Sequence, residues 1–299
     1  MANKEDIITR QLANEFLRSN EGEQIETMPM LAKKYSVGFG TIDKALNNLK
    51  TKGVIELHAR GQMGTYLVKK DFLKLFELAG NGPFVGQLPL PNAIEFEGLA
   101  TGFTEVFSNA GVPFALNFKN GASARMESLL NKRCDFIIVS ESSAERITAN
   151  EETEIVAKLS PKTFYSNLYV IYRKDAEERD AWKIGVDHKS YDNMLFSERE
   201  FPANQKINIP YYNFPYAIAD GRIDAAVIHS RTFVAIDLIN KLEFEPLIHK
   251  EVIGEVSRAT IVTLKENIPA SELFKNIIDV KKIEQIGKMV VDCKMVPSF

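Results

Sequence analysis

The run MLAKKYSVGFGTIDKAL, at residues 30–46, decides how the first part of the chain folds. Its first half has the apolar spacing of a short helix that begins near Pro29. Gly38 and Gly40 then predict a tight turn. The second half predicts a longer helix that opens at Thr41, stops before Gly53 and carries one apolar stripe: Ile42, Ala45, Leu46 and Leu49.

Segments on either side of this run complete a small domain. Upstream, Ile8, Leu12 and Phe16 recur every four residues, which predicts another helix. Downstream, residues 54–57 and 65–68 have the composition of short strands and flank a glycine-containing loop. The order helix, helix, turn, helix, hairpin is that of a winged helix-turn-helix, whose third helix is shaped to enter a DNA major groove.

The same segments resemble the GntR class of bacterial regulators, through residues 30–35, 37–46, 53–55 and 61–68. Two positions depart from the class, which usually carries Arg in the turn and early in the third helix. This chain has Phe39 and Asp43 there, and neither makes the bidentate contact that gives Arg its discrimination. The resemblance implies DNA binding, and we predict contacts from six polar residues: Thr41, Lys44, Asn47, Asn48, Arg60 and Gln62.

Basic residues are concentrated in this part of the chain. Residues 1–70 hold 11 Lys and Arg against 8 Asp and Glu, whereas the rest of the 299-residue chain holds 26 against 32. This asymmetry suits a front end that binds an anionic partner, and a solvated helical surface accounts for it about as well. The net charge of −3 excludes a chain that binds nucleic acid over its whole surface.

The composition also excludes several classes of protein. Hydrophobic residues make up 45% and charged residues 26%, as in an ordinary globular protein. Cys134 and Cys293 are the only cysteines, which rules out a disulfide scaffold and indicates a reducing compartment. The N-terminus is too charged for a signal peptide, and no stretch reaches the roughly 18 apolar residues of a membrane helix. We therefore expect a cytoplasmic protein that has no membrane partner.

Strand and helix patterns alternate from Phe84 onward, which predicts an α/β domain. Residues 71–83 before it are interpreted as a linker helix, whose apolar face packs between domains or at a dimer contact. The continuously apolar run 136–139 predicts a strand buried on both faces of a sheet. A second unit starts near Trp182, and its run 221–228 repeats the layout of 131–139: a loop, an acid and a buried strand.

Two α/β lobes joined by crossing strands resemble the type 2 periplasmic-binding-protein fold, which regulators use as an effector sensor. Further segments resemble the bacterial YhfZ family of transcriptional regulators over essentially the whole chain: residues 88–91, 97–102, 129–131, 135–140 and 296–299. The resemblance implies a DNA-binding domain over 1–70, the linker helix, and a two-lobed effector-binding domain over 84–299. We place the second lobe at about 182–255.

Ligands of such two-lobed folds lie between the lobes, at loops after strands and at helix N-termini. Four loops fit this description, and Ser123 and Ser190 within them also suit helix N-caps. We predict a small anionic metabolite, with Arg125 or Arg258 as its charge partner. The predicted ligand contacts are Asn92, Gly121, Ser123, Ser140, Asp187, Ser190 and Tyr211.

Motifs of common enzymes are missing from the sequence, including Walker A, G-x-S-x-G and H-E-x-x-H. The four histidines have no metal-ligand spacing, and Cys134 precedes a buried strand, where a thiol is inert. We expect no enzymatic activity, metal or cofactor. Thiamine-precursor synthases show that this fold can host catalysis, so an enzyme stays an alternative.

The function that these patterns favour is a homodimeric transcriptional regulator. It would bind a double-stranded operator and change its DNA affinity when the two-lobed domain closes on its effector. A DNA-binding scaffold, whose second domain dimerises without a ligand, is the other alternative.

Overall fold

The computed structural model describes residues 4–149, 151–176, 178–229, 238 and 240–299. It divides into an N-terminal unit, residues 1–83, and a C-terminal unit, residues 84–299, which we describe separately. Among the described residues, no helix is both long and apolar enough to cross a membrane.

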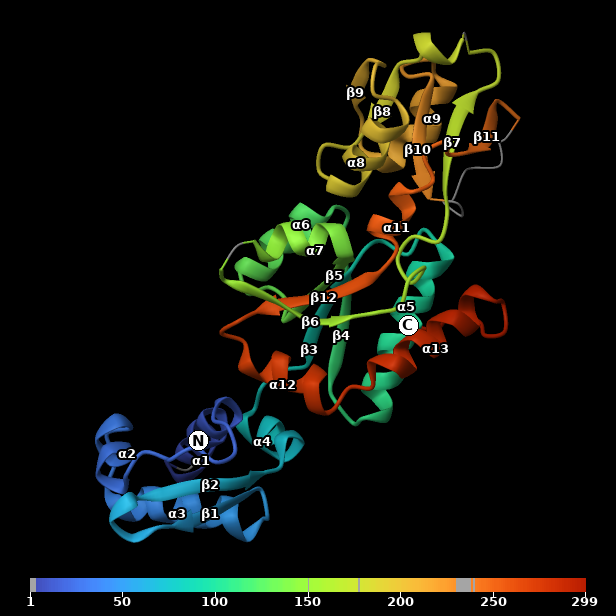
Figure 1. Cartoon of the computed structure of the whole chain (residues 1–299). Coiled ribbons are helices and arrows are strands. Elements are labelled where there is room, and N and C mark those ends of the chain that lie inside the picture. Colours follow the sequence, from blue (N-terminus) through green and yellow to red (C-terminus); the bar gives the residue numbers. More distant parts are fainter. Residues whose placement is uncertain (1–3, 150, 177, 230–237, 239) are drawn as a thin grey trace. The chain divides into compact units, whose positions relative to one another are not determined.

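The N-terminal unit has the predicted order of helix, helix, turn, helix and hairpin (Figure 1). Its core is formed by the apolar stripes of three helices, with Leu12, Ile42 and Leu49 fully buried. The strands of the hairpin pair antiparallel. The elements are α1 (Lys4–Arg18), α2 (Met28–Lys34), α3 (Phe39–Thr51), β1 (Ile55–Ala59), a 3-10 turn η1 (Gly61–Met63), β2 (Thr65–Lys70) and α4 (Phe72–Ala79).

Helix α3 begins two residues before the predicted start at Thr41. Gly38 is its N-cap, in an extended conformation, and its carbonyl accepts from the N–H of Thr41 at 3.0 Å. Phe39 is therefore the first residue of the helix rather than part of the turn.

Helix α4 differs from the predicted linker because it packs within the N-terminal unit. Asp71 caps its start by accepting from the N–H of Lys74, and Gly80 ends it in a left-handed conformation, with φ of 67°. Its apolar face packs on α1, and the amide of Asn14 donates to the carbonyl of Ala79 at 3.3 Å. Its apolar face is therefore covered by α1 rather than left for another domain or a second subunit.

The first lobe of the C-terminal unit contains a five-stranded sheet in the order β4-β3-β5-β12-β6. The three strands β4, β3 and β5 are parallel, whereas β12 is antiparallel to both of its neighbours. The strands are β3 (Phe84–Leu88), β4 (Phe114–Phe118), β5 (Phe136–Ser140), β6 (Thr153–Lys158) and β12 (Ala259–Leu264). The helices are α5 (Ile94–Asn109), α6 (Ala122–Leu130), α7 (Glu141–Thr148), α12 (Ile268–Asn276) and α13 (Val280–Val291).

The second lobe has a sheet in the order β11-β7-β10-β8-β9. Its strands are β7 (Leu168–Arg173), β8 (Ile184–Val186), β9 (Lys206–Asn208), β10 (Ala225–His229) and β11 (Leu242–Pro246). Its helical segments are η2 (Arg179–Ala181), α8 (Tyr191–Glu200), η3 (Tyr211–Asn213), α9 (Phe214–Ala219) and α11 (Val252–Val256). Because β7 lies inside this sheet, the lobe includes residues from Leu168 onward, earlier than the predicted 182.

The two lobes share one topology. Each sheet has three parallel strands, then one strand antiparallel to both of its neighbours, then an edge strand. The chain crosses between the lobes after β6 and again after β11 (Figure 1). Equivalent acids hold equivalent places, since Asp135 accepts from the N–H of Val85 and Asp224 from the N–H of Lys183. The repeated layout of loop, acid and buried strand in the sequence therefore corresponds to equivalent strands, β5 and β10.

Candidate functional site

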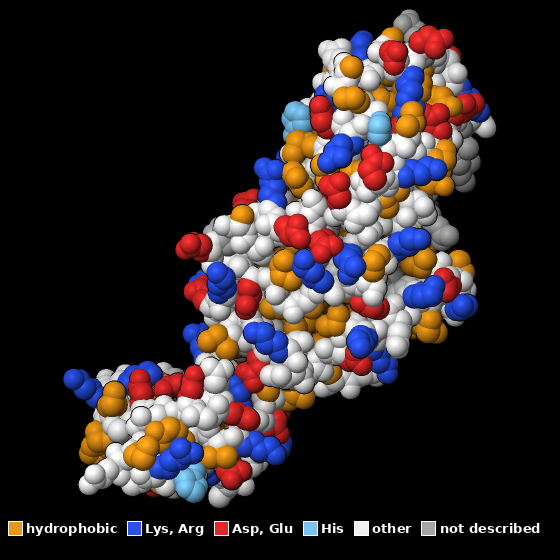
Figure 2. Space-filling model, in the orientation of Figure 1, with side chains coloured by type: hydrophobic (Ala, Val, Ile, Leu, Met, Phe, Trp, Pro, Cys, Tyr) orange, Lys and Arg blue, Asp and Glu red, His pale blue; other side chains and the backbone are white. Residues whose placement is uncertain are grey.

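Helix α3 presents a polar face on the outside of the N-terminal unit. Its other face is buried in the helical core through the predicted apolar stripe. Of the predicted DNA contacts on this helix, Lys44 and Asn47 are exposed, whereas Thr41 and Asn48 are half-buried. Lys and Arg side chains lie beside hydrophobic ones on this unit (Figure 2).

The hairpin tip supplies the other two predicted DNA contacts. Arg60 and Gln62 are both exposed in the loop that joins β1 to β2. The guanidinium of Arg60 lies over the ring of Tyr66, 4.4 Å from its centroid, which restrains the side chain while leaving its charge accessible. The six residues thus lie on the two elements of a winged helix-turn-helix that face DNA, and their contact with DNA stays a prediction.

A small cavity of about 40 Å³ lies between the two lobes of the C-terminal unit. Four of the seven predicted ligand contacts line it: Asn92, Gly121, Ser190 and Tyr211. The cavity also has a wall of aromatic side chains: Phe96, Phe164, Tyr165 and Tyr212. The first three of these were not predicted from the sequence. Loops from both lobes therefore converge on one place, as expected for an effector site, and ligand contact there stays a prediction.

The other three predicted ligand residues lie outside the cavity lining. Ser123 is exposed in the first turn of α6, whose N-cap is Gly121, so the predicted capping role of Ser123 is wrong. Asp187 is buried and accepts hydrogen bonds from the N–H groups of Lys189 and Tyr211. Its carboxylate therefore stabilises the conformation of the loop. Ser140 caps α7 and bonds to a residue of the other lobe. Ser190 caps α8, as predicted.

Arg125 is a buried charged group that forms no direct ion pair with a described carboxylate. Its side chain lines the interlobe cavity and is only 4% exposed. One guanidinium nitrogen donates to the carbonyl of Lys119 at 2.8 Å, but Nε has no hydrogen-bond partner, and no described carboxylate forms an ion pair with the group. Burial lowers the pKa of Arg125 to about 10, which leaves it charged at neutral pH. Asp192 acts on this cation only through space, and a buried guanidinium with an unpaired Nε favours an anion beside it.

Arg258, the second candidate, is already paired. Its Nε lies 3.4 Å from a carboxylate oxygen of Glu141, and it does not line the cavity. The structure therefore separates two arginines that the sequence left equivalent. A signal for Arg125 was present, because it falls on the apolar face of its helix, between Ala122 and Leu129.

Asp192 links the lobes at the edge of the cavity. Its Oδ1 accepts from the hydroxyl of Ser140 at 2.6 Å and from that of Ser143 at 2.8 Å. All three groups are buried. Burial raises the pKa of Asp192, although both hydroxyls and the charge of Arg125 favour its ionised form. The hydrogen bonds of this carboxyl join the two lobes. The free energy of burying the carboxyl depends on whether it is protonated.

A second buried pair also joins the lobes. Nε2 of His229 lies 3.3 Å from Oε2 of Glu95, although the contact lacks the alignment of a hydrogen bond. Burial acts to raise the pKa of Glu95, but His229 and a hydrogen bond from Ser166 outweigh it and lower that pKa below its ordinary value. Neither residue was predicted, because 134 residues of sequence separate them and no local pattern connects them.

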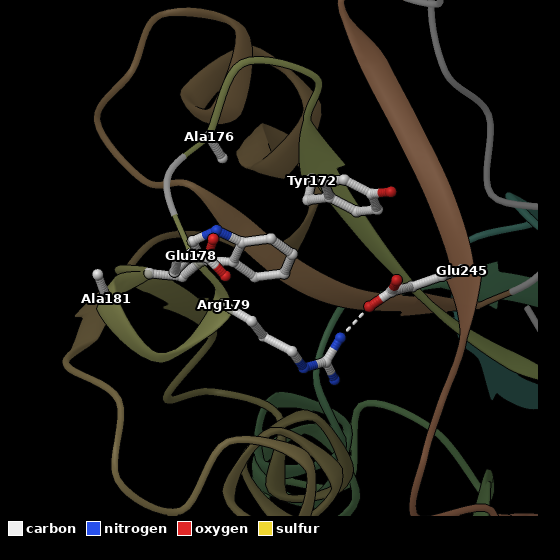
Figure 3. Close-up of a pocket in the computed structure, with 7 residues that line it drawn as sticks. Tyr172, Ala176, Glu178, Arg179, Ala181 and Glu245 are labelled. Carbon is white, nitrogen blue, oxygen red and sulfur yellow. Dashed lines mark hydrogen bonds and ion pairs between the residues drawn. The ribbon is translucent and has the colours of Figure 1, made fainter.

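A larger and more open pocket, of about 720 Å³, lies on the second lobe (Figure 3). Its cation, Arg179, points toward Glu245 and also pairs with the buried Glu200. Because its charge is already compensated, this pocket lacks the unpaired group that distinguishes the interlobe cavity. The described residues contain no cluster of three or more His, Cys, Asp or Glu that could hold a metal.

Cys134 is buried, as predicted. Burial, reinforced by the neighbouring Asp135, raises the pKa of its thiol to about 12, so the thiolate nucleophile is scarce at neutral pH. Cys293 is exposed.

These features define a class of protein with a helix-turn-helix domain followed by a two-lobed domain that resembles periplasmic binding proteins. A model described as a helix-turn-helix domain matches residues 20–67, and a model described as the YhfZ C-terminal domain matches residues 71–299. The chain belongs to the YhfZ family.

Relatives and solved structures agree with this assignment. The chain is 26% identical to the protein YhfZ of Escherichia coli (strain K12) over 99% of this chain and 98% of that protein. It is similar to the crystal structure of YhfZ from Shigella flexneri, with a TM-score of 0.59 and 26% identity over 73% of this chain and 94% of that one. The periplasmic aliphatic sulphonate binding protein SsuA of Escherichia coli shares the fold, with a TM-score of 0.52 and 10% identity over 72% and 75% of the two chains.

Proposed function

We propose that this protein is a cytoplasmic, homodimeric transcriptional regulator whose two-lobed domain senses a small anionic metabolite. The helix-turn-helix domain supplies operator binding, and the interlobe cavity supplies effector binding. The single observation that carries the effector half is Arg125, a buried cation with an unpaired Nε in a cavity between lobes. The proposed role of the two-lobed domain is ligand binding, without a catalytic step.

The chemistry around Arg125 favours a carboxylate, phosphate or sulfonate group. A guanidinium presents several N–H donors in a plane that matches two oxygens of such a group. The N-terminus of the nine-residue helix α6, which starts at Ala122 on the cavity wall, adds free N–H groups of the same polarity. The aromatic side chains that line the cavity would cover the rest of the ligand.

The small size of the cavity is the basis for the proposed mechanism of effector binding. Its 40 Å³ is far below the roughly 300–1,000 Å³ of pockets that hold small-molecule ligands. A metabolite therefore enters only when the lobes separate, and they close again around it in a different position. We propose that this change in the separation of the lobes is transmitted to the two DNA-binding domains of a dimer. A coupling of about 1–3 kcal/mol changes operator affinity roughly 5- to 150-fold.

A thermal-shift panel tests the proposal. The wild type, Arg125→Gln and the control Arg258→Gln would be heated with carboxylates, phosphates and sulfonates. At about 100 times its dissociation constant, a true ligand adds roughly 2.7 kcal/mol to folding stability. We expect at least one anion to raise the melting temperature of the wild type and of Arg258→Gln but not of Arg125→Gln. Equal shifts in all three proteins, or none with any anion, would contradict the proposal.

A further inference from the structure

Phe39 is a large apolar side chain that the N-terminal unit leaves in solvent. It is 58% exposed at the first position of α3. A Cβ added at Gly38 or Gly40, its two neighbours, would meet nothing within 4 Å, so the backbone around it is also open. No described aromatic ring packs against Phe39, whereas the buried face of the same helix is fully used in the core.

The position of Phe39 on the helix decides what can cover it. The N-terminal residues of the third helix of a helix-turn-helix are those that contact base edges in the major groove. Residues 33–70 carry 8 basic and 2 acidic side chains, a charge that complements duplex DNA. Lys44, five residues further along α3, is exposed, and a lysine there suits a phosphate contact. The occupant that fits both position and charge is double-stranded DNA.

The chemistry of Phe39 selects one base. A phenyl ring donates and accepts no conventional hydrogen bond, so it cannot read the polar edges of guanine, adenine or cytosine. Thymine alone presents an apolar C5-methyl group in the major groove, and a phenyl ring makes apolar contact with it. Gly38 and Gly40 have no side chain to prevent a close approach of this turn to the bases.

We propose that Phe39 is a specificity-determining residue that reads the methyl group of a thymine in each operator half-site. The inference rests on the proposed DNA-binding function and adds its base preference. Asp43, one turn along the helix, accepts from the amide of Asn47 at 3.2 Å, so that carboxylate already has a partner within the helix.

The test removes one methyl group from the DNA and one ring from the protein. A random duplex library is first selected with the full-length protein, and each thymine of the enriched site is then replaced by deoxyuridine, which lacks only the C5-methyl. Loss of one buried methyl corresponds to about 0.8 kcal/mol, or roughly a four-fold rise in dissociation constant. We expect this rise at one thymine per half-site for the wild type and no change there for Phe39→Ala.

Two controls separate the outcomes. Phe244→Ala removes a ring that is 46% exposed on the second lobe and should leave the methyl dependence intact. Circular dichroism and the melting temperature verify that Phe39→Ala is folded. If wild type and Phe39→Ala lose affinity equally at every deoxyuridine, or neither loses any, Phe39 does not read the methyl. If the wild type enriches no duplex at all, the DNA-binding function itself fails, and the inference fails with it.

Discussion

The hydroxyl of Ser140, at the end of β5 in the first lobe, donates a 2.6 Å hydrogen bond to Asp192 on α8 of the second lobe. Ser140 is a predicted ligand contact, and in the structure its hydroxyl joins the two lobes. Asp192 also lines the cavity that contains Arg125. A ligand that separates Ser140 from Asp192 would therefore release one of the contacts that keep the lobes together.

Asp192→Asn should change how stability depends on pH. Because burial raises the pKa of Asp192, folding shifts this carboxyl toward its protonated form relative to the unfolded chain. Relative to Asp192→Asn, the wild type is then most stable below the ordinary value of 3.8 and loses stability as the pH rises through the raised value. An asparagine oxygen still accepts from the two hydroxyls, so the variant should fold.

Urea unfolding of both proteins across a pH series measures this difference. Asp180→Asn, a change at an exposed acid, serves as the control and should show no such trend. A gap between wild type and Asp192→Asn that stays constant with pH would show that Asp192 has no raised pKa.

Lys44→Ala should weaken DNA binding about equally for all sequences. Lys44 is exposed on α3, and a lysine that contacts a phosphate releases a counterion on binding. We expect the slope of log affinity against log salt to fall in magnitude by about one unit. Fluorescence anisotropy on the selected duplex measures it, with the exposed Lys250→Ala on the second lobe as the control. An unchanged slope would reject Lys44 as a phosphate contact.

Gly102→Ala should destabilise the first lobe. A Cβ at this position would lie 2.7 Å from the carbonyl oxygen of Ile283, because α5 and α13 pack closely there. Such overpacking costs roughly 1–3 kcal/mol, which exceeds the gain of up to about 1 kcal/mol from the better helix propensity of alanine. Denaturant unfolding should show the loss. The control is Gly254→Ala, where a Cβ meets nothing within 4 Å, and equal stabilities for the two variants would contradict this account of the packing.

The two cysteines should differ sharply in reactivity. Cys293 is exposed, whereas Cys134 is buried with its thiol pKa raised to about 12. We expect a disulfide reagent to modify one thiol rapidly in the native protein and the second only after unfolding. Cys293→Ser should remove the fast reaction. Rapid native labelling of Cys293→Ser would show that the strand following Cys134 opens easily.

Patterns within a short segment were enough to predict most of the elements. The glycines after residue 37, the stripe of α3 and the apolar run of β5 each report on neighbours a few residues away. Relationships over long distances in the chain were not predictable. Strand β12 lies between β5 and β6 although it follows them by about a hundred residues, and β7 joins the second sheet although the first lobe precedes it directly.

The site was predictable to the level of loops but not of side chains. Four loop residues met at one cavity because strand ends and helix starts converge in this topology. Asp192 went unnoticed because its partners, Ser140 and Ser143, lie about fifty residues upstream. Arg125 was identified only as one of two arginines, since its burial depends on the second lobe as well as on its own helix.

The measurement that tests the central claim most directly is operator affinity with and without the anion that best stabilises the protein. The dissociation constant of the selected duplex would be measured by anisotropy for the wild type and for Arg125→Gln. We predict that saturating anion changes it at least about five-fold for the wild type and leaves it unchanged for Arg125→Gln. An identical dissociation constant for the wild type with and without bound anion would contradict the claim that the cavity regulates DNA binding.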